Sequence, residues 1–380
     1  MSVKTIRLAL VAGVLVALCS QPGARTRPAA YPPLIGGGQH GSRHGPADLV
    51  LIYQGGVHRL SWTEEQLQGY VTYRDRRSGR EQWLFDGFLF FEFQDGRGTR
   101  YVGQFKLRSA IRADWMWLSD RLFSRGVALD ALEQAIAAAS SRLGSPPRRR
   151  KVYLGLPEPI LRQKDWGQLD GRWLDFNVPE DRLAAIRWYV RETLRRWRER
   201  AFTQFDLQGF YWVAEDASQS RLLLPEVAEL IHREKLELIW IPYWVSPWRT
   251  RWRALGFDRA YLQPNHFFRP AVPDSRLDEA CATARALGMG LEIEFDGRAW
   301  TDDAYRARLP AYFARFRAAG ALAAAPLAWY EAGGAIARMA SSDDPSVRGL
   351  YDKVARVVIA RQAAADKIGR PEGRRNRAPH

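Results

Sequence analysis

The stretch Leu207-Gln-Gly-Phe-Tyr-Trp-Val-Ala-Glu-Asp216 is a short apolar run that ends in two carboxylates. A second stretch of the same form is Gly290-Leu-Glu-Ile-Glu-Phe-Asp-Gly297. Apolar runs of this length, bounded by polar residues, predict buried strands. Because an unpaired buried carboxylate is costly, an acid at the end of such a strand indicates that the end opens onto a polar site. We therefore expect Glu215 and Glu294 to face one cleft.

Six further apolar runs lie along the chain, and a helical pattern separates each run from the next. Strict alternation predicts parallel strands with crossover helices, and eight strands predict closure into a (β/α)8 TIM-type barrel of the α/β class. An open doubly wound sheet is the alternative, but no glycine-rich phosphate loop follows any run. The expected strands are residues 48–53, 86–93, 151–157, 207–214, 236–244, 258–264, 291–295 and 327–331. The expected helices are residues 63–73, 127–143, 179–202, 224–234, 249–255, 275–287, 302–319 and 347–364, with a functional loop at 96–120 and a further loop at 160–178.

The composition of the two ends differs from that of the expected barrel, which occupies residues 48–364 as a single domain. Residues 1–20 have the form of a secretory signal segment. Residues 21–47 are rich in Gly, Pro and Arg and are expected to form a disordered tether. Residues 365–380 are basic and contain Pro and Gly, which predicts a disordered tail.

The N-terminal segment indicates export. Lys4 and Arg7 precede an apolar run that is too short to span a bilayer, so no transmembrane span is expected in the mature protein. Cys19 follows this run, and a lipid anchor on it is an alternative fate. The only other cysteine is Cys281, so no disulfide framework is expected. The pattern fits a bacterial protein of the periplasm, the cell surface or the extracellular space.

Acids, amides and aromatic residues recur where the expected strands end. In barrels of this kind, the C-terminal ends of the strands and the loops after them form the active site. Such a mouth suits a sugar, because amides and acids bind hydroxyls and aromatic rings cover C–H faces. The residues expected to contact a carbohydrate substrate are Tyr53, Glu92, Trp212, Tyr243, Trp244, Gln263, Asn265, His266, Asp296, Trp300, Tyr330 and Glu331.

Two carboxyl groups on either side of the scissile bond are what glycoside hydrolysis needs. Glu215 follows the fourth strand and Glu294 ends the seventh, so we expect them to be the acid/base and the nucleophile. Glu292, Glu294 and Asp296 alternate along the seventh strand and therefore share the face that points into the barrel. Glu292 is expected to lie deeper as a hydrogen-bonded acid, and Asp296 to begin the loop.

Structural roles for the same residues remain open. Glu215 caps a loop or pairs with an arginine in one alternative, and Glu294 is a salt-bridge partner in a barrel without activity in another. His266 is expected to be a hydrogen-bonding residue. No cluster has the spacing of a zinc site, and no Ser or Cys lies in a nucleophile elbow, so neither a metal nor another cofactor is expected.

The chain is basic and rich in aromatic residues, with a formal net charge of +15 and 15 Trp, 14 Tyr and 17 Phe. Much of the basic excess lies in peripheral segments, such as Arg148-Arg-Arg-Lys151 and the C-terminal tail. No fingerprint of a nucleic-acid-binding fold accompanies the charge, so no nucleic-acid partner is expected. The charge is compatible with an anionic glycan, which basic residues would steer to the site.

Several separate blocks resemble the domain-of-unknown-function 4855 family. The blocks are Gly209-Phe-Tyr-Trp212 with Glu215, Trp240-Ile-Pro-Tyr243, Leu262-Gln-Pro-Asn-His-Phe-Phe268 and Gly288-Met-Gly-Leu-Glu-Ile-Glu-Phe-Asp296. The strands that begin at Asp86 and Lys151 also fit. The resemblance implies an exported barrel from a bacterial polysaccharide-handling context, without a settled substrate.

The layout is also distantly similar to that of the glycoside hydrolase clan A barrels. In that clan an acid/base follows the fourth strand and a nucleophile the seventh, which implies these roles for Glu215 and Glu294. The clan usually has Asn before its acid/base, and this chain has Ala214. The contact to a sugar 2-hydroxyl would then come from another residue, such as Asn265 or Gln263.

The function expected from the sequence is thus a secreted glycoside hydrolase, of the retaining type. One alternative is a non-catalytic glycan-binding barrel of the cell envelope. Another is a binder of anionic polymers, whose affinity would fall steeply with salt.

Overall fold

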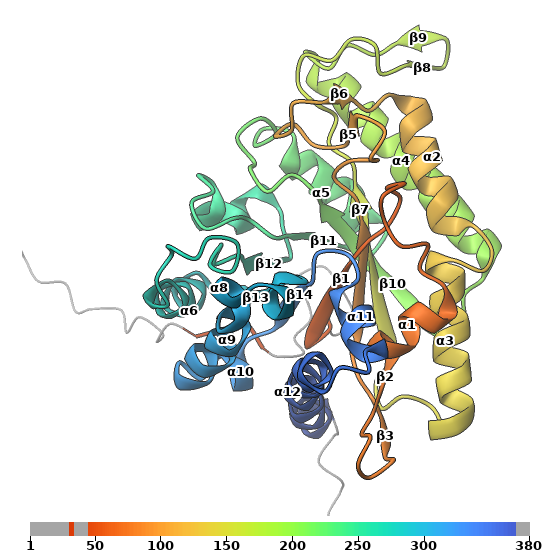
Figure 1. Cartoon of the computed structure of the whole chain (residues 1–380). Coiled ribbons are helices and arrows are strands. Elements are labelled where there is room, and N and C mark those ends of the chain that lie inside the picture. The colour runs from red at the N-terminus through yellow and green to blue at the C-terminus, as the bar shows by residue number, and fades with distance from the viewer. Residues whose placement is uncertain (1–29, 34–44, 370–380) are drawn as a thin grey trace, which may run out of the picture.

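The protein forms a closed barrel of eight parallel strands in the order β1-β14-β13-β12-β11-β10-β7-β4 (Figure 1). The structure is a computed structural model that describes residues 30–33 and 45–369. Each barrel strand lies within or overlaps one of the eight apolar runs, and the predicted (β/α)8 fold is confirmed. The barrel strands are β1 (Asp48–Tyr53), β4 (Gly87–Phe91), β7 (Arg150–Leu156), β10 (Phe205–Trp212), β11 (Glu237–Trp240), β12 (Arg259–Leu262), β13 (Gly290–Glu294) and β14 (Leu327–Tyr330).

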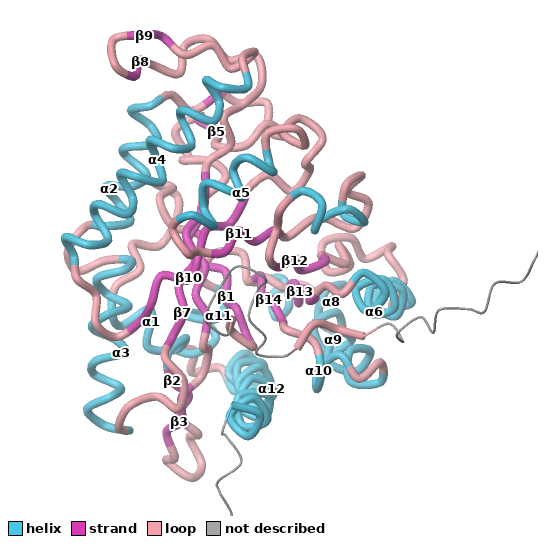
Figure 2. The backbone as a smooth tube through the Cα atoms, turned by 180° about the vertical axis from the view of Figure 1, so that it is seen from behind, coloured by secondary structure: helices cyan, strands magenta, loops and turns pink. Residues whose placement is uncertain are grey.

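Helices surround the barrel, and three two-stranded sheets lie at its ends. Figures 1 and 2 show that β5–β6 and β8–β9 lie at one end of the molecule and β2–β3 at the opposite end. The small sheets are β2 (Thr72–Arg74) with β3 (Glu81–Trp83), β5 (Thr99–Arg100) with β6 (Arg108–Ser109), and β8 (Gln168–Leu169) with β9 (Arg172–Trp173). The helices are α1 (Glu64–Val71), α2 (Arg112–Phe123), α3 (Ala128–Leu143), α4 (Pro179–Arg200), α5 (Leu224–Arg233), the 3-10 helix η1 (Arg249–Leu255), α6 (Ser275–Leu287), α7 (Arg298–Thr301), α8 (Asp303–Arg306), α9 (Arg308–Ala318), α10 (Ala321–Ala324), α11 (Ala335–Ser341) and α12 (Pro345–Gly369).

Alternation along the strands divides the apolar core into two clusters. On β10, Tyr211 belongs to the cluster inside the barrel, and Val213 just beyond the strand joins it. Phe210 and Trp212 belong to the cluster between the barrel and its helices. Side chains on a strand point alternately to the two faces, so this parity also directs Glu215 toward the barrel axis.

The sequence suggested that the segment 96–120 is a functional loop, and the structure shows regular elements there instead. It contains β5, β6 and most of α2. Trp115, Leu118 and Leu122 recur at helical spacing and are buried in the outer cluster, which explains why this part folds as a helix. Of the two tryptophans in this segment, Trp115 is therefore a core residue, whereas Trp117 is half-buried.

The segments before and after the barrel were expected to be disordered, and the parts of them that the structure describes are packed on the barrel. The last helix continues to Gly369, because Ala365 packs on Ala47 and Asp366 pairs with Arg148. In the expected tether, Ala47 is buried and the hydroxyl of Tyr31 donates a hydrogen bond of 3.0 Å to the carbonyl of Cys281. The predicted signal segment lies outside the described residues.

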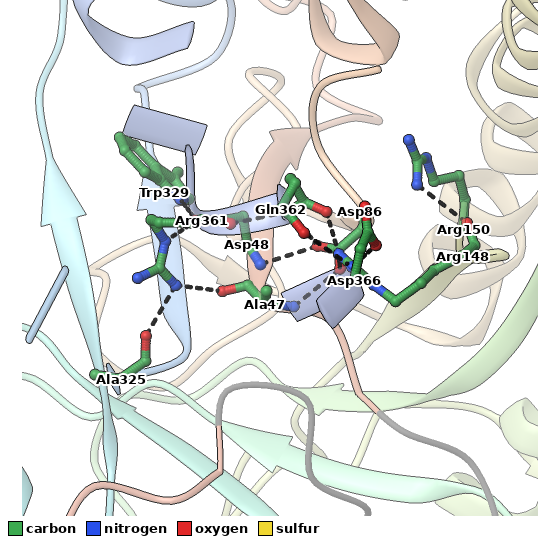
Figure 3. A network of polar contacts seen from close by, with 10 residues as sticks. All are labelled: Ala47, Asp48, Asp86, Arg148, Arg150, Ala325, Trp329, Arg361, Gln362 and Asp366. Atoms are coloured by element: carbon green, nitrogen blue, oxygen red, sulfur yellow. Dashed lines mark hydrogen bonds and ion pairs between the residues drawn. The ribbon is translucent and has the colours of Figure 1, made fainter. Parts of the chain in front are cut away.

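A buried polar network ties α12 to the N-terminal ends of the strands (Figure 3). Asp48 accepts hydrogen bonds from the Nε of Arg361 at 2.7 Å and from the Nε1 of Trp329 at 3.0 Å. Gln362 bridges Asp48 and Asp86 with its amide nitrogen. Burial raises the pKa of the Asp48 carboxyl, and the charge of Arg361 opposes this shift. Residues at this end of a barrel serve stability rather than chemistry.

Gly209 is required where β10 passes β11. A Cβ atom at this position would overlap the carbonyl oxygen of Glu237, and the register on β7 shifts between Leu207 and Gly209. We expect Gly209→Ala to lower the free energy of unfolding by about 1–3 kcal/mol, because the overlap forces the two strands apart. Denaturant titration checks this. Gly349→Ala in α12, where a Cβ meets open space, is the control and should stabilise by roughly 0.5–1 kcal/mol; equal effects of the two changes would contradict the explanation.

Candidate active site

Two buried glutamates of β13 point into the barrel. Glu292 and Glu294 are 1% and 0% exposed, whereas Ile293 between them packs in the outer cluster. The expected parity of this strand is therefore confirmed for both acids.

Glu294 sits in a pocket of hydrogen-bond donors. Its carboxylate accepts the backbone N–H groups of Asn265 at 3.2 Å and His266 at 3.0 Å, and the hydroxyl of Tyr312. Asn265 has a positive φ of 50°, and consecutive N–H groups in such a turn form an anion-binding nest. Burial raises the pKa of Glu294 to about 7, and the three donors oppose the rise. The three donors stabilise the ionised carboxylate, but burial outweighs them and the net effect favours the protonated form.

Glu215 follows β10 and is half-buried. Its carboxylate accepts a hydrogen bond of 2.8 Å from the amide nitrogen of Gln263 and a longer one of 3.4 Å from Gln104. Burial raises its pKa to about 6, and the hydrogen bond from Gln263 opposes the shift. A carboxyl with this pKa can hold and release a proton near neutral pH.

A chain of hydrogen bonds connects the two acids. Gln263 donates to Glu215, and the amide nitrogen of Asn265 donates to the side-chain oxygen of Gln263 at 3.1 Å. The backbone N–H of Asn265 then reaches Glu294. The structure therefore brings Glu215, Gln263, Asn265 and Glu294, all singled out in the sequence, into one network.

Glu292 lies beneath this network. Burial raises its pKa well above the ordinary value, and the charges of Glu294 and Glu215 raise it further. In the described part of the chain its Oε1 has no hydrogen-bond partner, which differs from the expected hydrogen-bonded acid. The burial of Glu292 and the charges of the neighbouring acids thus favour its protonated form.

Aromatic rings and an ion pair form the side of the mouth near β1. The rings of Tyr53 and Tyr330 meet edge to face, with centroids 5.7 Å apart. The guanidinium of Arg59 lies 4.2 Å from the centre of the Tyr53 ring and binds both carboxylate oxygens of Glu92 at 3.0 Å. Because the guanidinium of Arg59 pairs with the buried carboxylate of Glu92, the polar group that remains partly exposed here is the arginine. The sequence did not single out Arg59.

The opposite side of the mouth carries Tyr243 and Trp244, both half-buried. The charges of Asp216 and Glu215 contribute to a raised pKa of Tyr243, after the larger effect of burial, which places this hydroxyl near the acid. The backbone N–H of Trp244 donates to the side-chain oxygen of Asn265 at 2.6 Å. Both residues therefore adjoin the network.

Trp212 and Glu331 do not lie in the mouth, which corrects their predicted role in substrate binding. Trp212 is fully buried in the outer cluster, because its parity is opposite to that of Tyr211. Glu331 is also fully buried and binds the hydroxyl of Tyr70 and the N–H groups of Gly334 and Ile336. It holds α1 against α11.

Three other residues that were expected to contact substrate contact neighbouring residues instead. The ring of His266 is buried and hydrogen-bonded to Asp274, as expected for a structural histidine. Asp296 binds the guanidinium of Arg298 through both oxygens. Trp300 is half-buried in α7 and packs against the outer cluster.

A cleft of about 420 Å³ adjoins Glu215, and the sequence gave little indication of it. Gln104 lines the cleft and donates to Glu215, so the two features are continuous. The loops after β4, β7 and β10 contribute the lining, namely Arg100, Gly103, Gln104, Glu158, Ile160, Leu161, Arg162, Asp216 and Gln219. These residues lie far apart in the sequence, which explains why no local pattern reveals them.

The shifted pKa of Glu294 predicts a pH-dependent stability. A carboxyl whose pKa rises from 4.5 to about 7 on folding holds more protons in the folded state, so it lowers stability as the pH rises through this range. We expect the cost of Glu294→Gln in unfolding free energy to shrink between pH 5 and pH 8. Denaturant titrations across this range check it, with the exposed Glu229→Gln as control. A cost that grows with pH would mean that the three donors lower the pKa.

Residues 30–33 and 45–369 contain no group of three His, Cys, Asp or Glu side chains arranged to hold a metal ion. No described helix combines the length and apolar character that crossing a bilayer demands.

Solved structures with a similar course of the chain are distant. A mutant tryptophan synthase α-subunit from Pyrococcus furiosus is 8% identical, with a TM-score of 0.39, over 82% of this chain and 97% of the other. Rubisco from Pyrococcus horikoshii is 7% identical, with a TM-score of 0.39, over 88% and 68%. Tryptophan synthase from M. tuberculosis is 12% identical, with a TM-score of 0.38, over 82% and 92%.

No curated protein matches the chain. The model of the family described as Domain of unknown function (DUF4855) matches residues 48–356, which is the barrel that carries Glu215 and Glu294. The chain belongs to this family.

Proposed function

We propose that the protein is an exported glycoside hydrolase that acts on a polysaccharide or oligosaccharide. The observation that carries the proposal is the network that joins Glu215, after the fourth barrel strand, to Glu294, at the end of the seventh. The raised pKa of Glu215 suits a group that exchanges protons near neutral pH.

In this proposal Glu215 protonates the glycosidic oxygen and later activates water, and Glu294 attacks the anomeric carbon. The partial exposure of Glu215 suits a group that meets solvent and leaving group in turn. The raised pKa of Glu292 disfavours a second negative charge beneath Glu294. Gln263 and Asn265 lie between the two acids and supply the polar contacts that Ala214 cannot.

The test is the release of reducing ends from a panel of neutral and acidic polysaccharides. We expect at least one to be cleaved by the wild type and none by Glu215→Gln. Glu331→Gln is the matched control, because Glu331 is also a buried acid after a barrel strand but contacts α1 and α11. Full activity in Glu215→Gln, measured on folded protein, would reject the mechanism.

One observation favours a second candidate function, a glycan-binding barrel without catalysis. Glu294 is fully buried and scaffold donors hold both of its oxygens, as in a structural carboxylate. This candidate requires saturable glycan binding, no release of reducing ends, and unchanged affinity in Glu294→Gln.

A further inference from the structure

We propose that the cleft beside Glu215 binds an acidic sugar residue and that Arg162 recognises the carboxylate of that sugar. The inference deepens the proposed function and rests on it for the presence of a glycan at the mouth. It assigns a substrate class, polyuronates, and a residue that selects for it.

The cleft has the size and polarity of a ligand site. Its volume of about 420 Å³ lies in the range of small-molecule pockets. Glu158, 4% exposed, forms part of the lining, and its carboxylate is held by the N–H of Gly103 at 2.8 Å and the hydroxyl of Ser220 at 2.9 Å. Arg182 also binds Ser220, at 2.7 Å, and its charge offsets that of Glu158. The acid in the lining is therefore already balanced by the scaffold.

Besides Glu158, the charged residues that line the cleft are Arg100, Arg162 and Asp216. Arg97 and Arg108 of the same loop pair with Asp95 and Asp114 and do not line it. Arg100 is engaged by the carbonyls of Gly103 and Phe105, so it shapes the loop. Asp216 is the other acid of the lining and accepts the N–H of Ser218 at 2.8 Å.

Arg162 is the cation that is available to a ligand. It is exposed, it lines the cleft, and no carboxylate within the described residues pairs with it. Its backbone has a φ of +73°, a conformation that costs free energy for a residue other than glycine. A guanidinium offers a planar pair of donors that matches a carboxylate. Since Gln104 connects the cleft to Glu215, a sugar held by Arg162 would lie next to the proposed acid/base.

The test compares binding by Arg162→Gly, Arg162→Lys and a matched control. Lys235→Gly is the control, because Lys235 is an exposed cation with a φ of +58° that precedes β11 at the other end of the barrel. Both glycine variants lose one charge and relieve the same backbone strain. Affinity electrophoresis of the full chain would use polygalacturonate, alginate and hyaluronan, the same polymers with reduced carboxyls, and single-stranded DNA.

We expect binding to at least one polyuronate, little binding to its reduced form, and a roughly tenfold weaker affinity in Arg162→Gly. Arg162→Lys should retain part of the affinity, and Lys235→Gly should bind as the wild type does. Equal binding of the reduced polymer, binding of DNA alone, no binding to any polymer, or equal losses in both glycine variants would each overturn the inference. Glu215-dependent cleavage of a neutral glycan alone would support the proposed function and reject the acidic-sugar site. Arg162-dependent binding of a polyuronate without any cleavage would support the acidic-sugar site and reject the proposed function.

Discussion

Glu294→Gln is expected to lower the turnover of a glycan by roughly a thousandfold or more, because the substituted amide cannot attack the anomeric carbon. Glu215→Gln is expected to cost about 10²–10⁴-fold, because the leaving group then departs without a proton. The hydrogen bonds between the two acids run through Gln263 and Asn265, so the two losses should not be additive. Initial rates on the glycan that the wild type cleaves measure both effects.

The two roles are separated by azide, a small nucleophile that can replace a missing carboxylate. Glu294→Gly with azide should yield a glycosyl azide of inverted configuration, and Glu215→Gly one of retained configuration. Circular dichroism of each variant, compared with the wild type, controls for folding. A product of retained configuration from Glu294→Gly would mean that the assigned roles are wrong. The roles would also be wrong if folded Glu294→Gly is not rescued by azide while Glu215→Gly is rescued with inversion.

Arg361→Ala is expected to lower the free energy of unfolding by about 3–5 kcal/mol, the largest stability effect that the structure predicts. The side chains of both Arg361 and Asp48 are almost fully buried, 3% and 0% exposed, and their ion pair spans 2.7 Å. The guanidinium also binds the carbonyls of Ala47, Leu322 and Ala325, so its removal leaves Asp48 without its counter-charge and takes a hydrogen bond from each of three carbonyls. Denaturant titration measures the change.

Arg356→Ala, one residue more than a turn earlier in α12, is the matched control, because Arg356 is exposed and should contribute within about 0.5 kcal/mol. The double replacement Asp48→Leu with Arg361→Met removes both charges, and it should cost less than Arg361→Ala alone. If Arg361→Ala and Arg356→Ala have the same effect, the buried network does not hold α12 to the barrel.

The fold was predictable because its signal is repeated along the chain. Eight apolar runs alternate with helical patterns. An error at the boundary of one run does not change the number or the order of the runs. β11, for example, is four residues long although the apolar run suggested nine, and the barrel still closes. The helix α6 coincides with its prediction, since an apolar stripe and a following glycine mark its length.

Part of the site was predictable for a similar reason. The parity of a strand is a local property, so the inward direction of Glu292 and Glu294 follows from their spacing alone. The same rule, applied to β10, directs Trp212 outward, although the sequence suggested that this residue binds substrate. The parity of a residue on its strand therefore decides its direction, and its position at the strand end does not.

By itself, the sequence determined the barrel, the order of its strands, and the acids that end the fourth and seventh. Only the tertiary structure decided which strand-end acids remain available. Arg59 reaches Glu92 across 33 residues and Tyr70 reaches Glu331 across 261, so both acids are occupied. Glu215 instead meets two side-chain amides and stays half-buried, whereas Glu294, like Glu331, is held by two N–H groups and a hydroxyl. Such pairings depend on distances in space between segments remote in the chain, whereas parity and periodicity depend on the geometry of a single strand or helix.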